Sequence, residues 1–103
     1  MIFHFHTKNV TFFPEDQAYF EETLGHLRKL LSREEVHPDS VDMKINLEKN
    51  KHHSGEVLES SAHLTCPHHG SFHAETKSEN IKKCADELYA KLQPQVKKFH
   101  DKH

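Results

Sequence analysis

A chain of 103 residues with 34% hydrophobic and 29% charged side chains has room for one small core, so we expect a single domain over residues 1–103. The formal net charge of −2 at pH 7 argues against nucleic-acid binding through overall charge, and three scattered glycines are too few to cradle a nucleotide. No apolar run could cross a bilayer, and the N-terminal residues lack the zones of a signal peptide, which predicts a cytoplasmic protein without a membrane partner.

The N-terminal third predicts a strand followed by a helix. Residues 2–6 alternate between apolar and polar side chains, with Phe3 and Phe5 on one face, as in a half-buried strand. Pro14 suits the first turn of a helix, which the segment "REEVHPDS" at 33–40 is expected to end. The apolar stripe of this helix consists of Phe20, Leu24, Leu27 and Leu31.

The middle of the chain predicts three more strands. Residues 41–48 show the clearest alternation, and the segment "NKHHSG" at 50–55 is typical of a hairpin loop. A second strand is expected over 56–66, and "PHHG" at 67–70 predicts a turn into a third strand at 71–76.

The last segment predicts a second amphipathic helix that starts near Ser78, a plausible N-cap. Pro94 removes one backbone donor, so we expect a kink or a break there. The element order β-α-β-β-β-α indicates an α+β fold, a four-stranded sheet with two helices packed on one face. The apolar stripe of the last helix consists of Ile81, Ala85, Leu88, Leu92, Val96 and Phe99.

The stretch "TCPHHGSFH" at 65–73 poses a choice between a zinc site and a turn. A tetrahedral zinc site needs four converging Cys or His ligands, and only Cys66 is a cysteine here. Cys66 has the inward parity of its strand, whereas His63 and His73 have the outward parity. His68 and His69 could at most join a weak surface site. Pro67 and Gly70 are explained by a turn, which we favour.

Four histidines should emerge on the outer face of the sheet: His4, His6, His63 and His73. His63 and His73 would sit on neighbouring antiparallel strands and could touch. If the strands lie in chain order, His4 and His6 are two strands away from His63, roughly 10 Å. We favour a solvated sheet face with no metal and no cofactor, and His63 and His73 stay open as an alternative metal pair.

An enzyme is not predicted, because no Ser/His/Asp, paired-carboxylate or phosphate-loop arrangement is present. Cys84 falls near the buried side of the last helix, where packing is more typical than nucleophilic chemistry. Basic residues avoid the apolar stripe of this helix, and others end the first helix, which by itself is typical of a solvated face. They are Lys82, Lys83, Lys91, Lys97 and Lys98 in the last helix and Arg28 and Lys29 in the first.

Short motifs along the whole chain resemble those of one family. They are "KNV" at 8–10, the spacing of Tyr19, Phe20, Leu24 and Leu27, "GSFHAE" at 70–75, and "ADELYAKL" at 85–92 followed by "QVKKFHDK" at 95–102. In this order and at this spacing, the chain resembles the short ribosome hibernation factors. That family includes hibernation promoting factor and ribosome-associated inhibitor A and is also called the sigma-54 modulation protein family.

The resemblance implies a β-α-β-β-β-α fold and a non-catalytic monomer that binds the small (30S) ribosomal subunit. The partners would be 16S rRNA and neighbouring ribosomal proteins in the channel for messenger and transfer RNA, so that translation stops under stress or in stationary phase. The chain resembles the short type, without the additional C-terminal domain. The rRNA-binding residues implied by matching positions are Lys8, Lys29, Lys82, Lys83, Lys91, Lys97 and Lys98, with Arg28 as a neighbouring candidate.

Three features depart from the family pattern: Ala90 replaces an acid, Pro94 replaces a helix former, and the net charge is acidic. Two other interpretations therefore stay open, a histidine-rich metal-binding protein and a protein-binding relative that has lost its ribosome contacts. We also hypothesise that His100 and His103 add positive charge to the basic tail when they are protonated.

Overall fold

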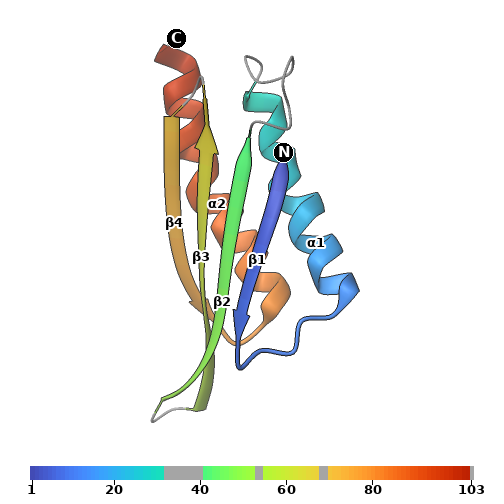
Figure 1. Ribbon diagram of the computed structural model, residues 1–103. Helices are drawn as coiled ribbons and strands as arrows, with labels where there is room; N and C mark the ends of the chain where they lie inside the picture. The colour runs from blue at the N-terminus through green and yellow to red at the C-terminus, as the bar shows by residue number, and fades with distance from the viewer. Residues whose placement is uncertain (32–40, 53–54, 68–69, 103) are drawn as a thin grey trace.

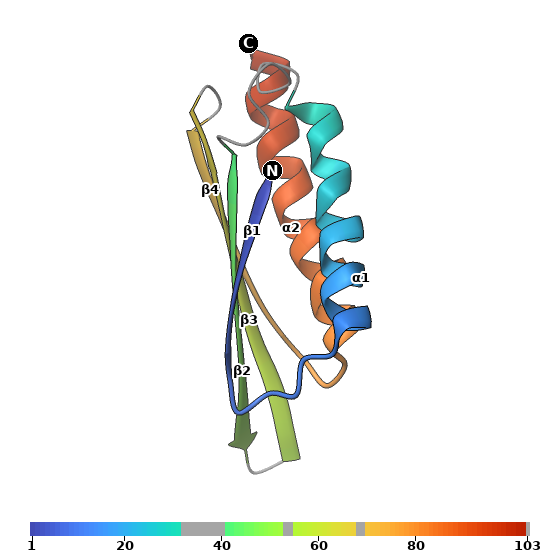
Figure 2. The same ribbon diagram turned by 45° about the vertical axis from the view of Figure 1, so that its right-hand side comes forward.

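The computed structural model describes residues 1–31, 41–52, 55–67 and 70–102, which form one sheet covered by helices on one face (Figures 1 and 2). The predicted α+β class and element order are confirmed. The elements are β1 (Ile2–Lys8), α1 (Pro14–Gly25), the 3-10 helix η1 (His26–Leu30), β2 (Asp42–His52), β3 (Gly55–Cys66), β4 (Gly70–Ser78) and α2 (Ile81–Lys102).

The four strands lie in chain order, β1-β2-β3-β4. β1 pairs parallel with β2, and the other two pairs are antiparallel hairpins. A parallel pair needs a connection that crosses back over the sheet, which here contains α1. Figure 2 shows that α1 and α2 cover the same face and begin at the same end of the molecule. The opposite face of the sheet is left without a covering element within the described residues.

The core lies between this sheet and the two helices. All four residues of the apolar stripe predicted for the first helix are at most 2% exposed, and the inward side chains of β2 and β3 meet them. α2 contributes the largest share of the helical side, which confirms its predicted apolar stripe. The α2 residues in the core are Cys84, Ala85, Leu88, Leu92 and Val96. Ile81 and Phe99 are partly buried.

The turn after β1 depends on one unusual backbone conformation. Asn9 has φ of 58°, in the left-handed region that Asn tolerates better than most residues. The chain then reaches α1, where Pro14 occupies the first turn as predicted. Phe13 donates its backbone N–H to the Asp16 carboxylate at 3.1 Å, which satisfies a donor at the helix start and explains why Asp16 is buried. The motif "KNV" is thus a turn signal as well as a family signature.

Two features of the predicted helices differ in the structure. The first helix changes to 3-10 geometry after Gly25, because glycine weakens the α-helix and 3-10 turns are common at helix C-termini. α2 begins at Ile81 rather than near Ser78, since Asn80 is the cap: its side-chain oxygen accepts the N–H groups of Lys82 at 2.8 Å and Lys83 at 3.3 Å. The predicted end of the first helix at 33–40 lies outside the described residues.

The hairpin between β2 and β3 is also tighter than expected. Backbone pairing continues from Asn50 opposite Val57 to His52 opposite Gly55, so most of the predicted loop at 50–55 is strand. Polar residues can extend a ladder here because pairing uses the backbone and not the side chains. A kink or a break was predicted at Pro94, and the break does not occur, since α2 is continuous across it. Within the described residues, no helix is long and apolar enough to span a membrane.

Candidate nucleic-acid interface

The solvent side of α2 carries a lysine stripe. This lysine stripe is the line of Lys83, Ala90 and Lys97, each seven residues after the one before. The line runs along the side of α2 opposite its buried residues. All three are exposed, and within the described residues neither lysine side chain makes a hydrogen bond or an ion pair. Lys98 is exposed beside this line. Their exposure allows these ammonium groups to meet an anionic partner.

Lys82 lies on the side of α2 that faces α1. Its Nζ is 5.7 Å from the centre of the Tyr19 ring, a cation–π distance, and Tyr19 donates a hydrogen bond of 2.7 Å to Asp86. This hydrogen bond raises the pKa of the Tyr19 hydroxyl above its ordinary value of 10.0. Farther along the same seam, the rings of His26 and Tyr89 meet edge to face at 6.3 Å. Lys82 was predicted from the sequence, and Tyr19, Asp86 and Tyr89 lie in the quoted family motifs. His26 had no such signal.

Arg28 and Lys29 are exposed in η1, which lies beside the C-terminal half of α2 (Figure 2). They share that end of the helical layer with Lys97 and Lys98, while Lys82 and Lys83 mark the other end of α2. The structure therefore brings six of the eight predicted residues onto the helical layer, on its solvent side or in its seam. They are Arg28, Lys29, Lys82, Lys83, Lys97 and Lys98.

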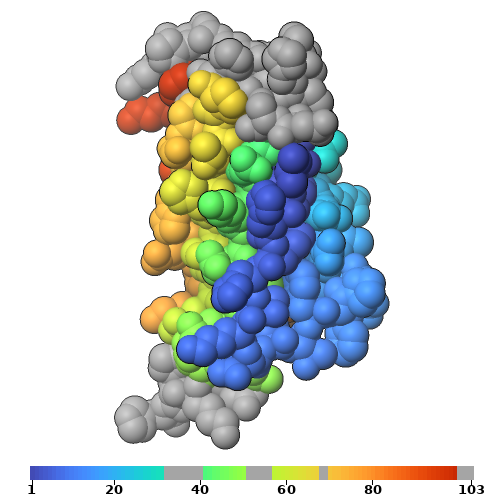
Figure 3. Space-filling model, viewed as in Figure 1, coloured from blue at the N-terminus to red at the C-terminus, as the bar shows by residue number. Residues whose placement is uncertain are grey.

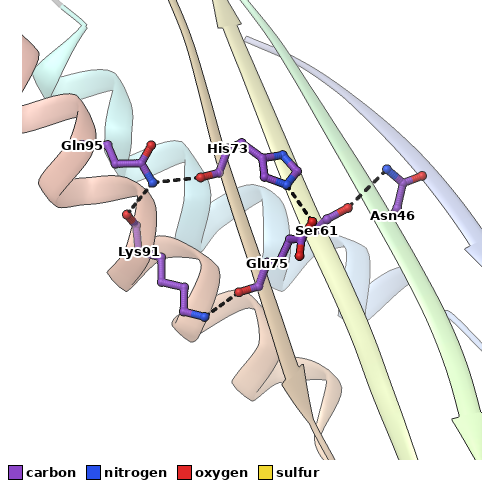
Figure 4. A network of polar contacts seen from close by, with 6 residues as sticks. All are labelled: Asn46, Ser61, His73, Glu75, Lys91 and Gln95. Atoms are coloured by element: carbon purple, nitrogen blue, oxygen red, sulfur yellow. Dashed lines mark hydrogen bonds and ion pairs between the residues drawn. The ribbon is translucent and has the colours of Figure 1, made fainter.

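Lys91 has a different environment. Its Nζ donates a hydrogen bond of 2.5 Å to the backbone oxygen of Glu75, and Gln95 donates one of 2.8 Å to the backbone oxygen of His73 (Figure 4). β4 is an edge strand, so these carbonyls would otherwise face water or a foreign strand. Lys91 thus covers a sheet edge, and its ammonium is already occupied by a backbone acceptor.

Lys8 has the parity of His4 and His6 on β1 and so belongs to the outer face of the sheet. Figure 3 shows this face of the molecule. The Nζ of Lys8 is 3.6 Å from a carboxylate oxygen of Glu48, and Lys77 and Glu59 make a similar pair. These pairs border a polar hollow of about 650 Å³ in which three lysines meet three glutamates. Because the charges balance, a phosphate gains little net attraction there. Lys8 therefore lies apart from the basic residues of α2 and η1.

The outer sheet face also carries the predicted histidines. Pairing across the strands places His4, Lys44, His63 and His73 in one row, which confirms the expected chain order and the two-strand separation. The His63 and His73 rings are 5.7 Å apart. Within the described residues, no group of three or more metal-ligating side chains is present.

Cys66 is buried, in agreement with its inward parity, and β3 pairs with β4 as far as Cys66 opposite Gly70, the expected hairpin. Gly70 has φ of +91°, a conformation that glycine adopts without strain. His68 and His69 lie outside the described residues. The predicted hairpin is therefore confirmed at its ends.

Cys84 is fully buried on the inner side of α2, which confirms the expected packing position. Burial raises the pKa of the Cys84 thiol above its ordinary value of 9.0, and the Ser60 hydroxyl opposes this shift without cancelling it. The unfolded chain would lose this proton at lower pH than the folded protein does.

This pKa difference predicts a stability that is complete below about pH 9 and falls as pH rises further, because the unfolded state then releases protons that the folded state keeps. The pKa of Tyr19 is also raised, so the free energy of unfolding should continue to fall as pH rises above 10.0, the ordinary pKa of this hydroxyl. Urea unfolding followed by circular dichroism across this alkaline range measures the effect. Cys84→Ala should flatten the first part of the decline and Tyr19→Phe the second. A free energy of unfolding that does not change with pH would contradict the prediction.

The fold and the surface together define a small mixed-sheet domain with lysines on an exposed helical layer. The chain belongs to the sigma 54 modulation protein / S30EA ribosomal protein family, whose model matches residues 3–103. This confirms the family predicted from the motifs. The protein is therefore a ribosome-associated factor of the hibernation and modulation type.

A solved structure with a similar fold is the N-terminal domain of Protein Y from Thermus thermophilus. The two chains share 18% sequence identity, the match covers 92% of this chain and 93% of that chain, and the TM-score is 0.61. At this identity the likeness concerns the fold. A search of curated proteins found no match.

Proposed function

We propose that this protein, as a monomer, binds the small ribosomal subunit in the channel for messenger and transfer RNA and thereby inhibits translation under stress or in stationary phase. The observation that carries the proposal is the family match over residues 3–103. The exposed lysines of α2 supply the physical means, since an rRNA surface presents closely spaced phosphates.

The lysine stripe suits a phosphate-lined surface in its length as well as its charge. Lys83 and Lys97 are fourteen positions apart, about 21 Å along an α-helix, so one face of α2 can contact several phosphates. In contrast, α1 exposes Glu15 and Glu22. We therefore place the RNA against α2 and η1, with the acidic side of α1 turned away from it, which reconciles RNA binding with a net charge of −2.

The proposal predicts that charge reversal on α2 weakens ribosome binding in a position-dependent way. The double variant Lys83→Glu/Lys97→Glu should lose most co-sedimentation with isolated 30S subunits at moderate salt. The slope of log affinity against log salt should also fall by about two, one for each lost phosphate contact. Lys44→Glu/Lys77→Glu on the outer sheet face makes the same change in net charge and is the matched control.

Equal losses in both double variants would mean that total charge, and not the α2 surface, governs binding. If the unmodified protein stays in the supernatant at low salt, the proposed ribosome site is wrong. Lys91→Ala provides an internal check. Because its ammonium already bonds the backbone of β4, this substitution should change the affinity less than Lys97→Ala does.

A further inference from the structure

Two histidines face each other across the last hairpin, on the sheet face away from α2. His63 of β3 and His73 of β4 are directly opposite in the antiparallel register. Their ring centres are 5.7 Å apart, with the planes inclined at 64°. Both residues are exposed, so an ion from solvent can reach their nitrogens.

This spacing matches two imidazoles on one ion. A metal–nitrogen bond of about 2.1 Å puts each ring centre about 3.2 Å from the metal, so two rings at a tetrahedral angle have centres roughly 5.2 Å apart. The observed 5.7 Å differs from that by an amount that small side-chain rotations can absorb. Opposite positions on paired strands also hold the two ligands close together before any ion binds.

Glu75 completes the arrangement as an orienting group. Its Oε1 is 3.0 Å from Nε2 of His73, which leaves Nδ1 of His73 for an ion. A carboxylate on the far nitrogen of a metal-binding imidazole fixes the ring and makes it a stronger ligand. Figure 4 shows Glu75 and His73 adjoining on β4.

The neighbouring charges limit the affinity without excluding an ion. Lys44 is opposite His63 on β2, and its ammonium opposes a cation, while the Glu75 carboxylate favours one. His4, in the same row, is bonded to Asp42 at 3.0 Å and lies two strands from His63, too far to act as a third ligand. Water would therefore fill the remaining coordination positions.

We propose that His63 and His73 form a binding site for a divalent transition-metal ion of the Cu²⁺, Ni²⁺ or Zn²⁺ class, with Glu75 as the positioning residue of His73. Imidazole ligands select this class over Mg²⁺, and Cu²⁺ binds most tightly of the three. The site lies on the outer sheet face and does not depend on the ribosome-binding surface of α2.

The test must locate the ion, because the chain has twelve histidines. Substoichiometric Cu²⁺ added to the full-length, tag-free protein should broaden the amide NMR signals that flank His63 and His73, and Zn²⁺ should compete for this effect while Mg²⁺ should not. His63→Ala and His73→Ala should each abolish the local broadening. Glu75→Gln should weaken binding about tenfold.

His6→Ala, an exposed histidine of the same face, and the double variant His68→Ala/His69→Ala are controls that should retain the broadening. Metal-free spectra of every variant show whether the fold is intact. Broadening that persists in both His63→Ala and His73→Ala, or that disappears in the His68→Ala/His69→Ala variant, would place the ion elsewhere and overturn the proposal.

Discussion

Replacing Leu88 by Ala is expected to lower the free energy of unfolding by about 3 kcal/mol. Leu88 is fully buried on the stripe of α2 that faces the sheet and α1. Alanine removes buried methyl groups and leaves a cavity that the close-packed neighbours can fill only in part. Because a small domain is stable by only about 5–15 kcal/mol, this single change removes a large fraction of the total.

Urea unfolding monitored by circular dichroism measures this loss, with the slope against urea checked for a constant denatured state. Lys83→Ala, on the opposite side of the same helix, is the control and should change the free energy by less than about 0.5 kcal/mol. A loss below about 1 kcal/mol for Leu88→Ala would contradict the described packing.

Pro94→Ala is expected to have the opposite sign and to stabilise the protein by as much as about 3 kcal/mol. Pro94 is exposed inside a continuous helix, where it has no N–H to donate to the backbone oxygen of Ala90 and its ring crowds that turn. Alanine restores the donor, removes the crowding and has the highest helix propensity.

Chemical denaturation gives the gain in stability, and amide hydrogen exchange localises it, since protection should rise most in the turns around Pro94. Lys97→Ala is the matched exposed substitution on the same helix and should change the free energy of unfolding little. No gain from Pro94→Ala would mean that the proline ring makes compensating contacts in the folded state.

The fold was largely predictable because its core follows simple periodicities. Alternation located all the strands, and the spacing of Phe20, Leu24, Leu27 and Leu31 identified the buried side of the first helix. The ends of elements were less predictable, since they depend on single hydrogen bonds. Ser78 and Asn80 are both good caps, and only the structure shows that Asn80 makes the capping bonds.

The candidate interface was predictable in composition and less so in arrangement. Sequence shows that Lys83, Lys91 and Lys97 avoid the apolar stripe, but it does not show what each side chain meets. The bond from Lys91 to β4 depends on which strand forms the edge, and the pairing of Lys8 with Glu48 depends on parallel register. The same limit applies to His63 and His73, whose exact opposition is a matter of register.

The bonds from Lys91 and Gln95 to β4 make α2 the closure of a sheet edge as well as the cover of the core. Fraying of the second half of α2 would uncover apolar surface and strand-pairing groups at the same moment, the combination that starts intermolecular β-sheet growth. A partner that docks along α2 and holds it helical would oppose that opening by mass action. Occupancy of this helix would then protect the protein from aggregation while it is bound.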